Sequence, residues 1–205
     1  MREARAGGPS LWLARHGETE WSAAGRHTSR TDLALTKVGE AQALALGRAL
    51  QAERFDLVAS SPRERARRTA ELAGLVATVD DDLAEWDYGQ LEGQTIEEIR
   101  ATFPGWTIWD GPWPGGETAA EVAARADRVV ARVLLLPPTG NALLVAHGHI
   151  IRVLAARWLR QPPSAGRQFM LGTATVSVLS WEHGEPAVLG WNMPAVPDLS
   201  RSLAH

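Results

Sequence analysis

The sequence contains no cysteine and only one lysine, and each shortage excludes a class of chemistry. Without cysteine the chain can form no disulfide, no thiolate nucleophile and no cysteine-ligated metal site. Lys37 is the one residue that could form a Schiff base or bind phosphate as a P-loop lysine does. A chain without cysteine suits a reducing compartment, so we expect a cytoplasmic protein.

Excess charge and long apolar runs are also missing. The formal net charge of -3 gives no reason to expect nucleic acid or an anionic membrane as a partner. No stretch approaches the roughly 20 apolar residues that would span a bilayer, and residues 1–10 lack the apolar core of a secretion signal. The apolar (45%) and charged (22%) fractions are those of an ordinary globular protein.

The length of 205 residues suits one domain with a substantial core. No internal repeat or linker indicates a second domain. We expect a flexible N-terminus over residues 1–10, one domain over 11–192 and a C-terminal tail over 193–205. The sequence leaves the oligomeric state open, with a homodimer as one alternative.

Strands and helices alternate along the chain. Apolar runs predict strands at 11–14, 57–59, 75–79, 142–146, 175–182 and 187–192. Helices are expected at 36–51, 62–73, from 95 onward, at 118–136 and at 149–160, with N-caps at Thr36 and Ser61 and capping boxes at Thr95/Glu98 and Thr118/Glu121. This order predicts an α/β fold, a three-layer α-β-α sandwich around a mostly parallel sheet.

Cationic and titratable side chains follow three of the predicted strands. Arg15-His16-Gly17 follows the first strand, "SSPRERARRTA" the second, and "AHGHIIR" overlaps and follows the strand at 142–146. The carboxyl ends of parallel strands share one edge, so Arg15, His16, His147 and an arginine of the second motif should converge. Such a cluster is costly without an anion, and phosphate matches its arginine forks and helix N-termini.

Arg65 is the arginine of the second motif that we expect at this site. It falls in the first turn of the predicted helix, where a cation opposes the helix dipole at a cost of about a few tenths of a kcal/mol. An anionic ligand would offset that cost, whereas Arg63, Arg67 and Arg68 read more simply as a solvated basic face. Taken alone, His16 could equally be a hydrogen-bonded core histidine, so these residues leave that alternative open.

Five motifs, in order, resemble those of the histidine phosphatase superfamily (phosphoglycerate mutase-like, branch 1). They are "LARHGETEW", "SSPRERARRTA", "LAEWDYGQLEG", "GGET" and "VAHGHIIR", and the resemblance covers about residues 11–191. The most similar branch carries W-S-x-x-G-x-[HY]-T and HGH-x-x-R and includes acid phosphatases and sedoheptulose-1,7-bisphosphatase. The resemblance implies a phosphoglycerate mutase-like fold.

The resemblance also implies a role for each site residue. His16 would be the nucleophile that forms a phosphohistidine, while Arg15, Arg65 and His147 would hold the phosphoryl oxygens. Glu85, which spacing alone would leave as a surface glutamate, would be the acid and base. By the same resemblance the substrate-binding residues are Thr28, Ser29, Tyr88, Gly148, His149 and Arg152.

We expect neither a metal nor a cofactor, as the family needs none. The alternation His147-Gly148-His149 is compatible with metal ligation, but no nearby pattern of acidic residues or cysteines completes such a site. His27 and His183 are taken as structural. Ser22 departs from the family, since many members have asparagine after the tryptophan.

One segment, "FPGWTIWDGPWPGGET", places three tryptophans in a loop rich in proline and glycine. Trp106, Trp109 and Trp113 either anchor this loop to the core or form a wall or lid that sizes the substrate pocket.

The resemblance favours a metal-independent phosphatase that hydrolyses phosphate monoesters of small metabolites, with sugar phosphates or bisphosphates preferred. Its expected partner is such a metabolite, with neither nucleic acid nor a membrane involved. Two alternatives are a phosphoglycerate mutase and a non-catalytic phosphate-binding module. The short chain disfavours the mutase, and an acid/base residue at Glu85 disfavours the module.

Overall fold

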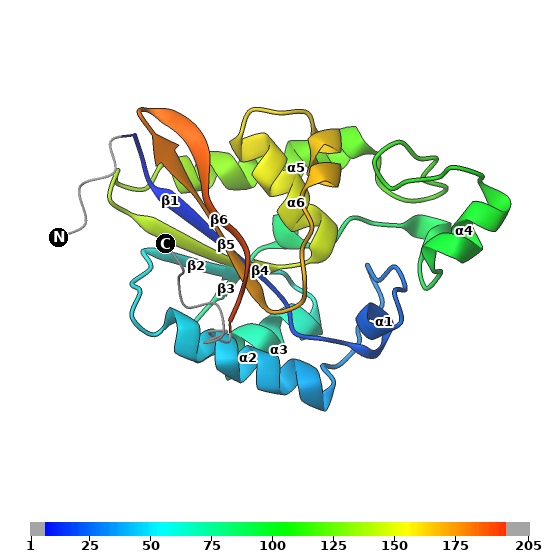
Figure 1. The fold of residues 1–205 in the computed structure, drawn as a ribbon, viewed down its shortest axis with the longest axis horizontal. Helices are drawn as coiled ribbons and strands as arrows, with labels where there is room; N and C mark the ends of the chain where they lie inside the picture. Colours follow the sequence, from blue (N-terminus) through cyan, green and yellow to red (C-terminus); the bar gives the residue numbers. More distant parts are fainter. Residues whose placement is uncertain (1–6, 196–205) are drawn as a thin grey trace, which may run out of the picture.

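A computed structural model describes residues 7–195 of the chain (Figure 1). Its centre is a six-stranded sheet in the order β3-β2-β4-β1-β5-β6. The strands are β1 (Ser10–Arg15), β2 (Leu57–Ser60), β3 (Thr78–Val79), β4 (Asn141–Ala146), β5 (Thr175–Glu182) and β6 (Glu185–Pro194). The strands β3, β2, β4 and β1 are parallel, whereas β5 and β6 are antiparallel additions at one edge. The predicted α/β class is confirmed.

Helices cover both faces of the sheet, which gives the expected three layers (Figure 1). One face carries α2 (Lys37–Leu50) and α3 (Glu64–Leu72), and the other carries α5 (Ala119–Leu134) and α6 (Gly148–Trp158). Two short helices, α1 (Glu20–Ala23) and α4 (Ile96–Thr102), lie beyond the carboxyl ends of the parallel strands. Short 3-10 helices occupy Asp81–Leu83, Gly89–Leu91 and Pro163–Gln168.

The central strands bury side chains on both faces. In β1, Leu11 and Leu13 join the core beneath α5 and α6, while Ala14 joins the core beneath α2 and α3. In β4, Leu144 joins the core beneath α5 and α6, and Leu143 joins the core beneath α2 and α3. Successive side chains of a strand point to opposite faces, so a strand covered on both sides reads as an unbroken apolar run.

Threonine caps define three of the helix starts as predicted. The side chains of Thr36, Thr95 and Thr118 accept hydrogen bonds from the third backbone N–H that follows, at the starts of α2, α4 and α5. Glu98 and Glu121 complete the two predicted capping boxes.

The predicted start of α3 is wrong. Its N-cap is Arg63, which makes no side-chain cap, and the helix begins at Glu64 rather than at Pro62. The hydroxyl of Ser61, expected to cap this helix, lies instead 2.6 Å from Nε2 of His147. The Ser61 hydroxyl therefore contacts a residue of the predicted site instead of capping α3.

Both chain ends differ from expectation where the structure describes them. Gly8, Pro9 and Ser10, which fall in the segment expected to be flexible, are buried: Trp181 packs against Gly8, and its Nε1 donates to the Pro9 carbonyl over 2.9 Å. Strand β6 runs to Pro194, into the segment expected as a tail, whereas residues 1–6 and 196–205 lie outside the described residues. Within 7–195, no helix has the length and apolar character needed to cross a bilayer.

Candidate active site

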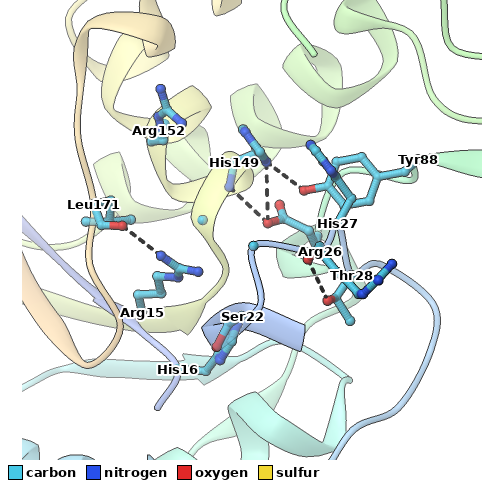
Figure 2. Close-up of a pocket in the computed structure, with 13 residues that line it drawn as sticks. Arg15, His16, Ser22, Arg26, His27, Thr28, Tyr88, His149, Arg152 and Leu171 are labelled. Atoms are coloured by element: carbon cyan, nitrogen blue, oxygen red, sulfur yellow. Dashed lines mark hydrogen bonds and ion pairs between the residues drawn. The ribbon is translucent and has the colours of Figure 1, made fainter. Parts of the chain in front are cut away.

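A cleft of ≈ 190 Å³ opens beyond the carboxyl ends of β1 and β4 (Figure 2). Eight of the predicted site residues line it: Arg15, His16, Thr28, Glu85, Tyr88, Gly148, His149 and Arg152. The other three, Ser29, Arg65 and His147, are at most 1% exposed and are buried beside it. Residues from distant parts of the chain thus meet at the edge that the strand-end rule indicates.

His16 is held as a neutral imidazole. Its Nδ1 lies 2.7 Å from the Gly17 carbonyl oxygen, which can only accept, so Nδ1 carries the proton and Nε2 is unprotonated. Burial, with the charges of Arg15 and Arg65, holds the pKa of His16 well below its ordinary value of 6.5. An unprotonated Nε2 is the form of histidine that can act as a nucleophile.

The backbone after His16 is fixed from two helices. The N–H of Gly17 donates to Oγ1 of Thr69 on α3 over 3.0 Å. A Cβ on Gly17 would lie 2.4 Å from the Gly39 carbonyl oxygen of α2, so only glycine allows this approach. The loop that carries His16 is therefore clamped between α2 and α3.

His147 faces His16 with a ring-centre distance of 5.1 Å. Its Nε2 lies 2.6 Å from the hydroxyl of Ser61, which also accepts from the Arg63 N–H and so has its own proton free to donate. Its Nδ1 is buried with no partner among the described residues. Burial, with Arg65 and His16 nearby, lowers the pKa of His147 well below 6.5. A neutral His147 that accepts at Nε2 carries its proton at Nδ1, ready for an anion.

Arg15 and Arg65 are cations that bind backbone carbonyls, and among the described residues neither is in direct ion-pair contact with a carboxylate. Arg15 donates to the Leu171 carbonyl over 2.7 Å, and Arg65 donates to three carbonyl oxygens of residues 28–31. In both residues Nε is buried and without a partner in the described part of the chain. Two guanidiniums with spare donors, near Glu85 but not bonded to it, suit a bound phosphoryl group.

Glu85 lines the same cleft and is oriented by the start of α6. Its carboxylate accepts backbone N–H bonds of 2.9 Å each from Trp86, His149 and Ile150. A Cβ on Gly148 would lie 3.6 Å from both Arg15 Cζ and Glu85 Oε2, so this glycine leaves the space between them open. A substrate oxygen placed there would be within reach of a carboxyl group.

The outer part of the cleft is a polar and aromatic wall. The Tyr88 hydroxyl lies 2.6 Å from Nδ1 of His149, and His27 contacts the Tyr88 ring edge-on at 4.8 Å (Figure 2). Burial raises the pKa of Tyr88 well above 10 and lowers that of His149 well below 6.5, so both groups are neutral. Arg152 lies 4.7 Å above the Trp109 ring.

The structure adds residues that the sequence reasoning missed. His27, taken as structural, lines the cleft, as do Ser22, Gly25, Arg26 and Leu171. His27 occupies the [HY] position of the motif W-S-x-x-G-x-[HY]-T, so this pattern could have indicated it. No sequence pattern indicates Leu171, because it contributes to the site through its backbone carbonyl, which accepts a hydrogen bond from Arg15.

The tryptophan loop packs into the core and also contacts residues that line the cleft. Trp106 and Trp109 are 2% and 8% exposed, and Trp113 stacks on buried Trp86. Trp106 also contacts His27, and Trp109 contacts His149 with ring centres 5.4 Å apart. The anchoring interpretation fits this burial, whereas the three tryptophans do not line the cleft themselves, so the wall or lid interpretation stays a prediction.

The two histidines of the His147-Gly148-His149 motif serve different partners. His147 binds Ser61, whereas His149 binds Tyr88. Among the described residues, no group of three or more histidines and carboxylates is arranged to hold a metal ion.

Comparisons with known proteins agree with this geometry. A family model described as histidine phosphatase superfamily (branch 1) matches residues 11–194. An acid phosphatase from Mycobacterium tuberculosis is 44% identical over 185 residues, 88% of this chain and 91% of its own. A sedoheptulose 1,7-bisphosphatase from Saccharomyces cerevisiae is 35% identical over 182 residues, 73% of this chain and 67% of its own.

Two further matches complete the comparison. A probable phosphoglycerate mutase from Salmonella choleraesuis is 32% identical over 200 residues, 93% of each chain. A solved structure from Mycobacterium tuberculosis has a TM-score of 0.88 and 40% identity, covering 91% of this chain and 98% of its own. The chain belongs to the histidine phosphatase superfamily, branch 1.

Proposed function

We propose that this protein is a metal-independent phosphatase that hydrolyses phosphate monoesters of small metabolites through a phosphohistidine on His16. The observation that carries the proposal is the neutral, unprotonated Nε2 of His16 beside two arginines whose buried Nε atoms have no hydrogen-bond partner among the described residues. A nucleophile next to cations with spare donors suits transfer of an anionic group.

In the first step, Nε2 of His16 attacks phosphorus and the bond to the ester oxygen breaks. Arg15, Arg65 and Nδ1–H of His147 donate to the phosphoryl oxygens, whose charge they neutralise. Glu85, in its protonated form, gives its proton to the leaving oxygen, which departs as an alcohol.

In the second step, the resulting Glu85 carboxylate takes a proton from a water molecule. That water attacks phosphorus, the bond to His16 breaks, and orthophosphate leaves. Glu85 is protonated again and His16 is neutral again, so the cycle closes without a metal ion or a cofactor.

The outer wall supports a polar substrate. Tyr88, His149, Arg152 and Thr28 present hydroxyl, imidazole and guanidinium groups, which suit the hydroxyls and any second phosphate of a sugar phosphate. The names of the acid phosphatase and sedoheptulose bisphosphatase relatives support the same class. We infer action in the cytoplasm as a single domain, whose expected range of 11–192 the first and last strands extend to 10–194. We infer neither nucleic acid nor a membrane as a partner, and keep a homodimer as one alternative.

A phosphate-release assay tests the proposal. Wild type and His16→Ala would be compared on sugar phosphates, sugar bisphosphates and an aryl phosphate, with and without EDTA. We expect turnover that survives EDTA, disappears in His16→Ala and passes through a phosphohistidine that an alkaline denaturing quench with labelled substrate traps, because the P–N bond is stable to base and labile in acid. Turnover abolished by EDTA, or unaffected by the substitution, would overturn the mechanism.

The mutase is a second candidate because a relative carries that name. Both activities share the phosphohistidine, and they differ in whether water or the substrate receives its phosphoryl group. Product analysis with 3-phosphoglycerate separates them, since we expect orthophosphate and glycerate. Formation of 2-phosphoglycerate without orthophosphate would favour the mutase.

A further inference from the structure

A partly buried ion pair lies outside the cleft, and the proposed chemistry does not use it. Arg125 of α5 is 7% exposed, and its Nε and Nη2 donate to the Glu117 carboxylate over 2.7 and 2.8 Å. Glu117 belongs to the "GGET" motif that precedes α5. Neither residue lines the cleft.

The same guanidinium binds the chain segment that carries Glu85. Arg125 donates to the carbonyl oxygens of Asp82 (2.8 Å), Ala84 (2.7 Å) and Glu85 itself (3.2 Å). With its two bonds to Glu117, Arg125 makes five hydrogen bonds, which uses its full set of donors.

Glu117 holds the other side of that segment. Its carboxylate accepts from the Asp87 N–H over 2.9 Å, and its carbonyl accepts from Trp86 Nε1 over 2.8 Å. A Cβ on Gly116 would lie 2.3 Å from the Asp87 carbonyl oxygen, so a glycine is needed for this contact. The backbone is therefore pinned immediately before and immediately after Glu85.

We propose that the Arg125–Glu117 pair positions the Glu85 carboxyl group for proton transfer to the leaving oxygen. The inference rests on the proposed function, in which Glu85 is the proton donor. Helix α6 fixes the Glu85 side chain through two N–H bonds, and the ion pair fixes its main chain from α5. Both are positioning residues, which act only through Glu85.

The dependence of rate on the leaving group isolates this role. A p-nitrophenolate leaves without a proton, whereas an alkoxide such as that of glycerol phosphate needs one, so only the alkyl ester depends on the placement of the acid. The value of kcat/KM covers the steps through phosphoryl transfer to His16. Its alkyl-to-aryl ratio is independent of how much enzyme is folded, because one preparation hydrolyses both esters.

Two conservative substitutions test the pair. Arg125→Lys keeps the charge but offers three donors instead of five, and Glu117→Gln removes the charge with little change of shape. We expect each to lower kcat/KM for the alkyl ester by about 10-fold or more and for the aryl ester by less than about 3-fold, since misplacement of a catalytic group costs up to about 10²-fold. Glu85→Gln sets the reference, with a larger loss in the same direction.

Arg128→Gln is the matched control. Arg128 lies on the same helix and holds Asp82 through its carboxylate, but its side chain is 59% exposed and makes no contact with Glu85 among the described residues. We expect its alkyl-to-aryl ratio to equal that of wild type.

The outcomes separate the two ideas. An unchanged ratio in Arg125→Lys and Glu117→Gln, with the ratio lowered in Glu85→Gln, would overturn the positioning role alone. An unchanged ratio in Glu85→Gln would overturn the acid role of Glu85, and the inference with it. If one variant fails to fold, the other still decides.

Discussion

His16 stays neutral because burial and two neighbouring arginines disfavour its protonated form. The Gly17 carbonyl then decides which nitrogen keeps the proton. Three local features of the residue's surroundings thus produce an imidazole that can attack phosphorus without first losing a proton. The same arginines that would bind the substrate also prepare the nucleophile.

A titration of the free protein followed by NMR tests this account of His16. We expect its imidazole to titrate well below pH 6.5, because protonation would add a buried charge next to Arg15 and Arg65. The His16→Asn variant assigns the resonance. A pKa at or above 6.5 would contradict the account.

Ser61 gives a second prediction for a single residue. Its hydroxyl lies 2.6 Å from Nε2 of His147, so Ser61→Ala should free His147 to change tautomer and should lower kcat/KM by about 10-fold, the loss expected for one hydrogen bond of about 1 to 1.5 kcal/mol. Ser60→Ala is the control, because the Ser60 side chain donates only to the Ser61 carbonyl. Equal activities of the two variants would argue against this role.

The sequence predicted which side chains meet but not what holds them. Arg15, His16 and His147 were found because each lies at or just after a strand's carboxyl end, and parallel strand ends share an edge. Ser61 was misread because its partner is 86 positions away, and Arg125 was missed because it reaches Glu85 across 40 positions. Such contacts depend on how helices pack, which no local pattern encodes.

Among the structural elements, the loop over residues 103–116 packs against two different parts of the molecule. Its tryptophans fill the core on one side and support His27, His149 and Arg152 on the other. Residue spacing could not distinguish packing against the core from support of the cleft residues, since an aromatic side chain in a loop is packed in both situations. The threonine caps were easier to predict, because a cap involves only residues three positions apart.

Trp109→Phe and Trp113→Phe together test the wall. Trp109 supports both His149 and Arg152, whereas Trp113 stacks on Trp86. We expect similar losses of melting temperature in both variants, because each removes buried aromatic surface. Only Trp109→Phe should change substrate preference, with KM for a sugar bisphosphate raised several-fold and KM for an aryl phosphate little affected. Matching substrate profiles would mean that the loop is an anchor alone.

Across the whole molecule, the four parallel strands of the sheet carry the site and the two antiparallel strands complete the core. The alternation of strands and helices predicted this α/β class, because each parallel connection needs a crossover. The short β3 was overestimated, since the apolar residues at 75–77 lie outside any strand. Local apolar runs do not reveal how far strand pairing extends.

Buried histidines make the stability of the whole protein depend on pH. The pKa values of His16, His147 and His149 lie well below 6.5 in the folded protein, mainly through burial. As the pH falls through 6.5, the unfolded chain takes up protons at these residues that the folded protein does not, so the free energy of unfolding decreases.

Urea unfolding at pH 7.5, 6.5 and 5.5 measures this effect, within a range above the ordinary pKa of carboxyl groups. We expect stability to fall at each step downward, and to fall less steeply in His149→Asn, which removes one of the three groups. Equal free energies of unfolding at pH 7.5 and 5.5 would contradict the prediction.

The spare donors of the two arginines have a consequence for how the protein would work in a cell. The guanidinium groups of Arg15 and Arg65 are charged near neutral pH, so they attract phosphoryl oxygens after the reaction as well as before it. Released orthophosphate presents the same oxygens as the ester and competes for the same donors. Ambient phosphate would therefore act as a competitive inhibitor of the enzyme, and turnover would rise when cellular phosphate is scarce.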